Sequence, residues 1–258
     1  MGTSYRKLDL PAHRLHTGPL ILVGKEYPFV SACPALAPAK EGDPQVFMER
    51  IAATLLNRLM SKIDGWASML PVSGYRSFAE QQTLFRQSLA ENGLAFTMDY
   101  VARPGYSEHH TGYAIDLGLA SEQVDFIRPH FPQSGICKKF MTLAPEYGFI
   151  ERYPEGKTAV TGIAYEPWHF RYVGLPHARI ITDKGFALEE YIAFLRDYPH
   201  GKRPLTYMEK NMRAQISYLP AVNQGVDQVQ IRADRPYAVS GNNIDGFILT
   251  EWRTLDED

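Results

Sequence analysis

Cysteine is scarce in this sequence, and it has no long apolar run. Only Cys33 and Cys137 occur, and neither belongs to a Cys-x-x-Cys pair. A disulfide framework is therefore not expected, and a reducing compartment fits the composition. No stretch approaches the roughly 18 apolar residues that cross a bilayer, so we expect no membrane span. The first residues lack the apolar core and cleavage site of a signal peptide, which predicts a cytoplasmic protein.

An excess of positive charge is also missing. Lysine and arginine total 27 against 29 aspartate and glutamate residues, which gives a net charge of -2. The sequence therefore lacks the basic field that nucleic-acid binding requires, and we expect no nucleic-acid partner. Its 258 residues, 45% hydrophobic and 22% charged, exclude extended disorder and fit a main domain with at most a small appendage.

The apolar pattern predicts helices early and late in the main domain, with strands between them. One helix is expected to begin at Asp43-Pro44, where Asp can cap the helix and Pro suits the first turn. Residues 77–80 read Ser-Phe-Ala-Glu, a capping box that opens a second helix. Alternating or short apolar segments predict strands at 69–75, 112–119 and 168–173. The order favours an α+β fold, in which helices flank a central antiparallel sheet.

The character of the sequence changes near Pro204. Beyond it, Val229, Ile231 and Ala233 alternate with polar residues, and residues 240–243 form a turn signal before an apolar segment. We therefore predict a main domain at residues 1–203 and a small β appendage of unknown role at residues 204–258.

Two segments contain the residues of a potential metal site. Residues 107–116 read SEHHTGYAID, and residues 166–174 read EPWHFRYVG. Within them, His109, Asp116 and His169 form a set of two histidines and one carboxylate, which zinc accepts while leaving a fourth position for water. If the strands that carry Asp116 and His169 pair, the three side chains converge on one face of the sheet. We therefore predict one zinc ion per chain.

Two charged residues near this set suit a hydrolytic reaction. Glu166 lies three residues before His169, so its carboxylate can stand beside the metal without being a ligand. Such a group can take a proton from a metal-bound water and deliver it to a leaving amine. Arg76, at the end of a predicted strand, can face the oxyanion of a tetrahedral intermediate. Each residue alone has an ordinary structural explanation, but the combination predicts a catalytic site with Glu166 and Arg76 as catalytic residues.

These motifs resemble the signature of a known family. SxHxxGxAxD and ExWHxRYVG, together with SGYRS at residues 73–77 and Gln81, are similar to the zinc D,D-peptidases of VanX and VanY type. The resemblance covers residues 70–175 and places the peptidase in the predicted domain 1–203. It implies hydrolysis of the D-Ala-D-Ala dipeptide, removal of the terminal D-Ala from peptidoglycan precursors, or both, in vancomycin resistance or cell-wall metabolism. The expected cytoplasmic location favours a bifunctional enzyme with both activities.

The resemblance also implies a role for each matching residue. It implies zinc ligation by the two histidines and the aspartate, with Glu166 as the catalytic base and Arg76 polarising the scissile carbonyl. Substrate-binding roles follow for Ser107, which would hold the C-terminal carboxylate, and for Gln81. The expected partner is a small peptide that ends in D-Ala-D-Ala, and the sequence leaves the oligomeric state open.

Two rival interpretations remain. A phage-type peptidoglycan endopeptidase of the L-alanyl-D-glutamate type also resembles this family, and residues 204–258 would then be a wall-binding module. A non-catalytic binding protein that keeps its zinc site, as in the hedgehog signalling domains, is the second alternative. The presence of both Glu166 and Arg76 favours an enzyme.

Overall fold

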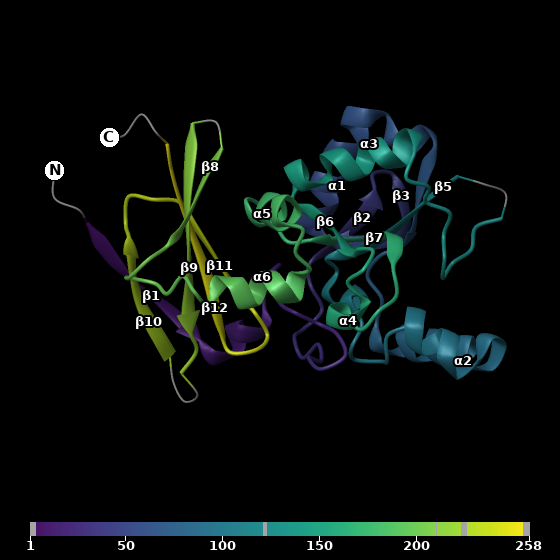
Figure 1. Cartoon of the computed structure of the whole chain (residues 1–258), viewed down its shortest axis with the longest axis horizontal. Helices are drawn as coiled ribbons and strands as arrows, with labels where there is room; N and C mark the ends of the chain where they lie inside the picture. The colour runs from purple at the N-terminus through teal and green to yellow at the C-terminus, as the bar shows by residue number, and fades with distance from the viewer. Residues whose placement is uncertain (1–3, 121–122, 210, 223–225, 255–258) are drawn as a thin grey trace. The chain divides into compact units, whose positions relative to one another are not determined.

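The computed structural model describes residues 4–120, 123–209, 211–222 and 226–254. The chain forms two compact units, whose elements are labelled in Figure 1. The larger unit is Val23–Glu189, and the smaller unit combines Met1–Leu22 with Glu190–Asp258. The sequence-based division fell between residues 203 and 204. The compact units divide the chain elsewhere because the N-terminal strand β1 (Tyr5–Pro11) pairs in antiparallel fashion with β10 (Val226–Arg232).

A four-stranded antiparallel sheet forms the centre of the larger unit, as the α+β prediction requires. Its strand order is β4-β5-β7-β6, so the two middle strands are β5 and β7. In this sheet Asp116 of β5 pairs directly with His169 of β7. The strand bounds are β4 (Met69–Ser73), β5 (Ala114–Leu119), β6 (Phe149–Tyr153) and β7 (Glu166–Tyr172).

The helix expected from Asp43 begins later than the sequence predicted. Residues Asp43–Glu49 form strand β3, which pairs with β2 (Leu36–Lys40), and helix α1 runs from Arg50 to Ile63. Glu49 caps the helix, since its carboxylate accepts hydrogen bonds from the backbone N–H groups of Ile51 and Ala52. The prediction was wrong because hairpin pairing with β2 overrides the local Asp-Pro signal.

Helix α2 (Phe78–Tyr100) begins at the predicted capping box. The Ser77 side chain accepts from the Glu80 N–H, and the Glu80 side chain accepts from the Ser77 N–H. Gly93 kinks this helix, because it has φ 80° and helical turns resume beyond it. The remaining helices are α3 (Gly135–Leu143), α4 (Thr158–Thr161), α5 (His177–Lys184) and α6 (Leu188–Leu195).

The core of the larger unit lies between the sheet and helices α1 and α3. Leu56 and Leu59 of α1 join Phe140 of α3 in one buried cluster with side chains of the sheet, among them Ile115 and Phe170. Because successive side chains of a strand point to opposite faces, Ile115 enters this core while its neighbour Asp116 is directed to the other face. The same alternation separates Phe170 from His169. The apolar pattern thus fixes the face on which the polar residues gather.

The smaller unit is built mainly of strands, as predicted for the C-terminal residues. One sheet has the order β11-β12-β9-β8, and the β1-β10 pair forms a second sheet. Leu10, Val229, Ile231, Phe247 and Leu249 form its apolar core. The bounds of these strands are β8 (Leu205–Glu209), β9 (Met212–Pro220), β11 (Tyr237–Gly241) and β12 (Gly246–Thr254).

None of the helices in the described residues is both long enough and apolar enough to cross a membrane.

Candidate metal centre and active site

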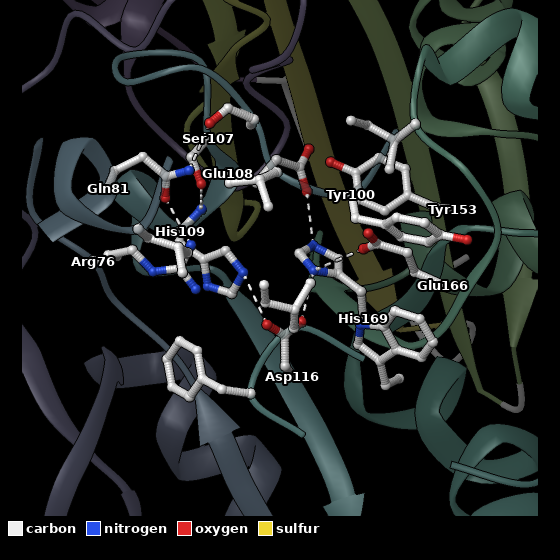
Figure 2. A pocket seen from close by; sticks show the side chains of 17 residues that line it. Arg76, Gln81, Tyr100, Ser107, Glu108, His109, Asp116, Tyr153, Glu166 and His169 are labelled. Atoms are coloured by element: carbon white, nitrogen blue, oxygen red, sulfur yellow. Dashed lines mark hydrogen bonds and ion pairs between the residues drawn. The ribbon is translucent and has the colours of Figure 1, made fainter. Parts of the chain in front are cut away.

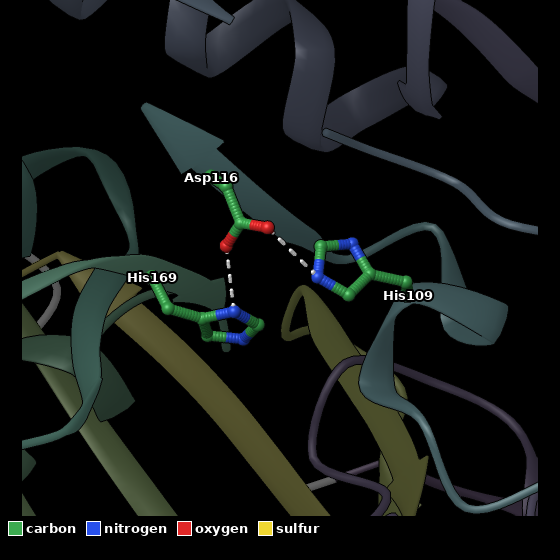
Figure 3. Close-up of side chains that lie close together, drawn as sticks. All are labelled: His109, Asp116 and His169. Atoms are coloured by element: carbon green, nitrogen blue, oxygen red, sulfur yellow. Dashed lines mark hydrogen bonds and ion pairs between the residues drawn. The ribbon is translucent and has the colours of Figure 1, made fainter. Parts of the chain in front are cut away.

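The three predicted metal ligands come together from three different elements of structure. Asp116 and His169 face each other on the central strands β5 and β7. His109 comes from the short 3₁₀ helix η3 (Glu108–Thr111), which precedes β5. Ser107 caps this helix, because its hydroxyl oxygen accepts a hydrogen bond from the His109 N–H at 3.3 Å. Figure 3 shows the Asp116 carboxylate between the two imidazole rings.

Their side-chain atoms are close enough to share one ion. His109 Nε2 lies 3.2 Å from one carboxylate oxygen of Asp116, and His169 Nδ1 lies 2.8 Å from the other. One ligand atom from each residue lies within 4.8 Å of the other two. All three side chains are buried. The geometry therefore brings together the whole predicted ligand set.

The hydrogen bonding of His109 agrees with a metal-binding role. Its Nδ1 lies 2.6 Å from the carbonyl oxygen of Gly74. A carbonyl oxygen only accepts, so Nδ1 carries the hydrogen and Nε2 presents its lone pair toward Asp116. Two imidazole nitrogens and a carboxylate form a donor set that suits a catalytic zinc ion. The residues present thus fit the metal that the sequence predicts.

Charge interactions in the site shift the pKa values of Asp116 and His169 in the opposite direction to burial. Burial alone would raise the pKa of Asp116, but His109 and His169 hold it well below its usual range. Burial likewise would lower the pKa of His169, yet the carboxylates around it, Asp116 first, raise it to about 9. Asp116 therefore stays ionised although it is buried, and a buried negative charge attracts cations more strongly than an exposed one.

Glu166 stands beside the three predicted ligands, at the start of β7. Its Oε2 lies 3.7 Å from His169 Nδ1, the nitrogen that also faces Asp116. The side chain is buried, and burial raises the pKa of Glu166 to about 8. A carboxyl group with a pKa near neutrality can both accept and donate a proton, as general acid–base catalysis requires.

Arg76 lines the same pocket, and neutral side chains hold its guanidinium group in position. Its Nη1 donates to Gln81 Oε1 at 2.7 Å, and its Nη2 donates to Ser73 Oγ at 2.5 Å. Gln81 in turn donates from Nε2 to the Ala102 carbonyl at 2.6 Å. Burial lowers the pKa of Arg76. Gln81 therefore orients the guanidinium group, a contact that the sequence did not predict.

A single pocket brings together all seven site residues named from the sequence. Figure 2 shows them around one cavity, with Arg76, Gln81 and Ser107 on one side and Glu166 on the other. Tyr100, Tyr153 and Trp168 also line this pocket. The seven residues are Arg76, Gln81, Ser107, His109, Asp116, Glu166 and His169.

Sequence reasoning missed Glu108, which is buried in the wall of this pocket. Its carboxylate is paired with Arg152 and Arg171, and these two arginines hold its pKa well below the usual range against the effect of burial. A charged residue directly before a predicted ligand was the available signal. The partners of Glu108 come from β6 and β7, so its environment could not be inferred from the motif itself.

Comparison with known proteins points to the same family as the sequence motifs. The family VanY, D-alanyl-D-alanine carboxypeptidase, matches residues 45–175. The chain is 45% identical over 179 residues to the bifunctional D-Ala-D-Ala dipeptidase and D-Ala-D-Ala carboxypeptidase VanXYC of Enterococcus gallinarum, covering 68% of this chain and 94% of that protein.

Two solved structures extend the comparison. The vancomycin resistance D,D-dipeptidase VanXYg, in complex with a D-Ala-D-Ala phosphinate analog, superposes with a TM-score of 0.94 at 43% identity, covering 97% of this chain and 100% of that one. The D,D-pentapeptidase VanY from a VanB-type resistance cassette, in complex with Zn(II), gives a TM-score of 0.55 at 28% identity, covering 67% of this chain and 98% of that one. The predicted resemblance is confirmed: the chain belongs to the VanY family of D-alanyl-D-alanine carboxypeptidases.

Proposed function

We propose that this protein is a zinc-dependent D,D-peptidase that hydrolyses D-Ala-D-Ala and removes the terminal D-Ala from peptidoglycan precursor peptides. The observation that carries the proposal is one pocket that contains a metal-ligand set and, beside it, a buried carboxylate that is not part of the set. Family membership supports the reaction class. The two activities in the name of VanXYC support both substrates, and the Zn(II) complex of a VanY relative supports the metal.

The metal would be held by His109 Nε2, the Asp116 carboxylate and His169 Nδ1. When bound in such a set, zinc supplies a Lewis acid that polarises a carbonyl group and lowers the pKa of a water molecule. Glu166 takes a proton from the attacking water and passes it to the departing amine of D-Ala. Burial raises the pKa of Glu166 in the metal-free chain, and a carboxyl group with a raised pKa is suited to hold that proton between the two steps.

The other side of the pocket would bind and polarise the peptide. Arg76 presents its guanidinium group to the carbonyl oxygen of the scissile bond, where negative charge develops, and Gln81 and Ser73 keep it in place. The Ser107 oxygen accepts from the His109 N–H, which leaves its O–H to donate to the C-terminal carboxylate of the substrate. A free terminal carboxylate is therefore part of what the site recognises.

The test is hydrolysis of the terminal bond in four compounds, measured as release of the C-terminal residue: D-Ala from D-Ala-D-Ala and from a precursor pentapeptide, D-alaninamide from its C-terminal amide, and D-lactate from a peptide ending in D-Ala-D-lactate. The first two should be cleaved, and a chelator should abolish both reactions. The amide should be a poor substrate, because a site built to bind a carboxylate leaves polar groups unpaired without it. A protein that serves vancomycin resistance should spare the D-lactate ester. Equal rates on all four compounds would overturn the proposal and favour the endopeptidase alternative.

The cytoplasmic location predicted from the sequence stays a prediction, and cell fractionation tests it.

A further inference from the structure

Next to His169 lies a cluster of four charged side chains, Glu108, Arg152, Arg171 and Glu189, of which the first three are buried and Glu189 is 21% exposed. The side chains of Glu108 and Arg152 are 1% exposed, and that of Arg171 is fully buried. Arg152 Nε donates to Glu108 at 2.7 Å, and its two terminal nitrogens donate to Glu189 at 2.9 and 2.6 Å. Breaking a buried charge pair on one side leaves an uncompensated buried charge, so this cluster is held firmly in its geometry.

The two oxygens of Glu108 have different surroundings. Oε1 contacts both arginines, at 2.7 Å from Arg152 Nε and 2.8 Å from Arg171 Nη1. Oε2 makes no hydrogen bond within the described part of the chain, although it is buried. It lies 3.7 Å from His169 Nε2, a buried nitrogen that likewise has no hydrogen-bond partner there. Figure 2 shows the Glu108 carboxylate directed at this ring.

The two nitrogens of His169 therefore face different groups. Nδ1 faces the catalytic side, at 2.8 Å from Asp116 and 3.7 Å from Glu166. Nε2 faces Glu108. A histidine that ligates a metal through one nitrogen keeps its hydrogen on the other, and that N–H commonly donates to a carboxylate, which fixes the orientation of the ring. Glu108 is the carboxylate in that place.

We propose that Glu108 is a positioning residue: it accepts the Nε2 hydrogen of His169 and so directs the Nδ1 lone pair at the metal, while Arg152 and Arg171 hold Glu108 in place. The proposal rests on the proposed function only in naming zinc as the metal. It gives the buried arginines a part in the site, although neither of them would contact the substrate.

The alternative is a purely structural role, in which Glu108 only neutralises the charges of Arg152 and Arg171. A Glu108→Gln substitution separates the two roles, because the arginines decide which way the amide turns. Both arginines are donors, so the amide oxygen should face them and the NH2 group should face His169. An N–H donor beside Nε2 favours a lone pair there and places the ring hydrogen on Nδ1, where it blocks metal binding. The matched control is Glu189→Gln, which weakens the same arginine cluster without touching His169.

The first experiment measures the zinc dissociation constant of the metal-free protein by competition with a chromophoric chelator, with circular dichroism as the check on folding. Loss of such a partner typically weakens metal binding about 10–100-fold, which is the change expected for Glu108→Gln. Glu189→Gln should stay within about threefold of the wild type, because the carboxylate that faces the ligand remains. Equal losses in the two variants, or a wild-type constant in Glu108→Gln, would overturn the proposal.

A second measurement needs no variant and applies even if Glu108→Gln does not fold. Nitrogen-15 NMR of the zinc-loaded wild-type protein should show His169 with its hydrogen on Nε2 and a downfield proton shift from the hydrogen bond to Glu108. A hydrogen on Nδ1, or an Nε2 hydrogen that exchanges freely with water, would contradict the proposal. Neither readout uses D-Ala release, so a failure of the proposed peptidase activity would be seen separately.

Discussion

Removing the metal should make this protein lose stability as the pH rises, and His169 governs the effect. In the metal-free fold, burial opposes protonation of His169, but the Asp116 carboxylate and its neighbours outweigh burial and raise the pKa to about 9 from 6.5. A group whose pKa is raised by folding contributes its full stabilisation below the unfolded pKa and loses it as the pH rises through the folded value. The loss should therefore fall between pH 6.5 and 9.

The size of the effect follows from this shift. A rise from 6.5 to about 9 corresponds to roughly 3 kcal/mol, at about 1.4 kcal/mol per pKa unit. Glu166 acts in the same direction, since burial raises its pKa to about 8, but the two groups titrate as a coupled pair and their contributions do not add. For a chain of this size, about 3 kcal/mol lowers the midpoint of thermal unfolding by roughly 6–12 °C.

The assay is thermal unfolding followed by circular dichroism between pH 6.5 and 9, once with chelator and once with one equivalent of zinc. A ligating histidine must give up the proton at its metal-binding nitrogen, so the zinc-loaded protein has no such stabilisation to lose. The gap between the two unfolding midpoints should widen with pH, while titrations shared by both forms cancel. A constant or narrowing gap would show that His169 does not have a raised pKa in the metal-free fold. Metal-free His169→Gln, as the control, should show a smaller fall with pH, because only the contribution of Glu166 remains.

Three further substitutions test the catalytic parts of the account. Glu166→Gln should keep its zinc, measured by metal analysis, but lower kcat by about 10²–10⁴-fold, because it removes the proton carrier; a variant with normal turnover would exclude that role. Arg76→Ala should lower kcat by about 10²–10³-fold with little change in KM, and a pure KM effect in steady-state kinetics would reassign Arg76 to substrate binding. Gly74→Ala would bring a Cβ to 2.2 Å from the Phe47 carbonyl oxygen. It should destabilise the fold by about 1–3 kcal/mol in denaturant unfolding and weaken zinc binding, since the Gly74 carbonyl orients His109; unchanged stability and affinity would contradict this.

The ligand set could be predicted from the sequence because its members lie in short motifs on strands with a clear apolar alternation. Ile115 and Phe170 face the core, so Asp116 and His169 share the opposite face once β5 and β7 pair. The capping box at Ser77 could also be predicted, because its hydrogen bonds join residues only three positions apart.

The features that sequence reasoning missed depend on contacts between distant segments. The hairpin of β2 and β3 replaced the expected helix start at Asp43, because strand pairing overrides a local capping signal. The pairing of β1 with β10 joins an N-terminal strand to the C-terminal strands, and no local sequence pattern predicts this pairing. The burial of the charged Glu108 side chain depends on Arg152 of β6 and Arg171 of β7, which are distant from it in the sequence.

The most direct test of the central claim is a titration of the metal-free protein with zinc, in which D-Ala release from D-Ala-D-Ala is measured after each addition. We expect no release without metal, a linear rise in rate with added zinc, and a break at one equivalent of zinc per chain. We also expect no release at any zinc level from His109→Ala, which lacks one ligand. Full activity in the metal-free protein, or wild-type activity in His109→Ala, would contradict the account.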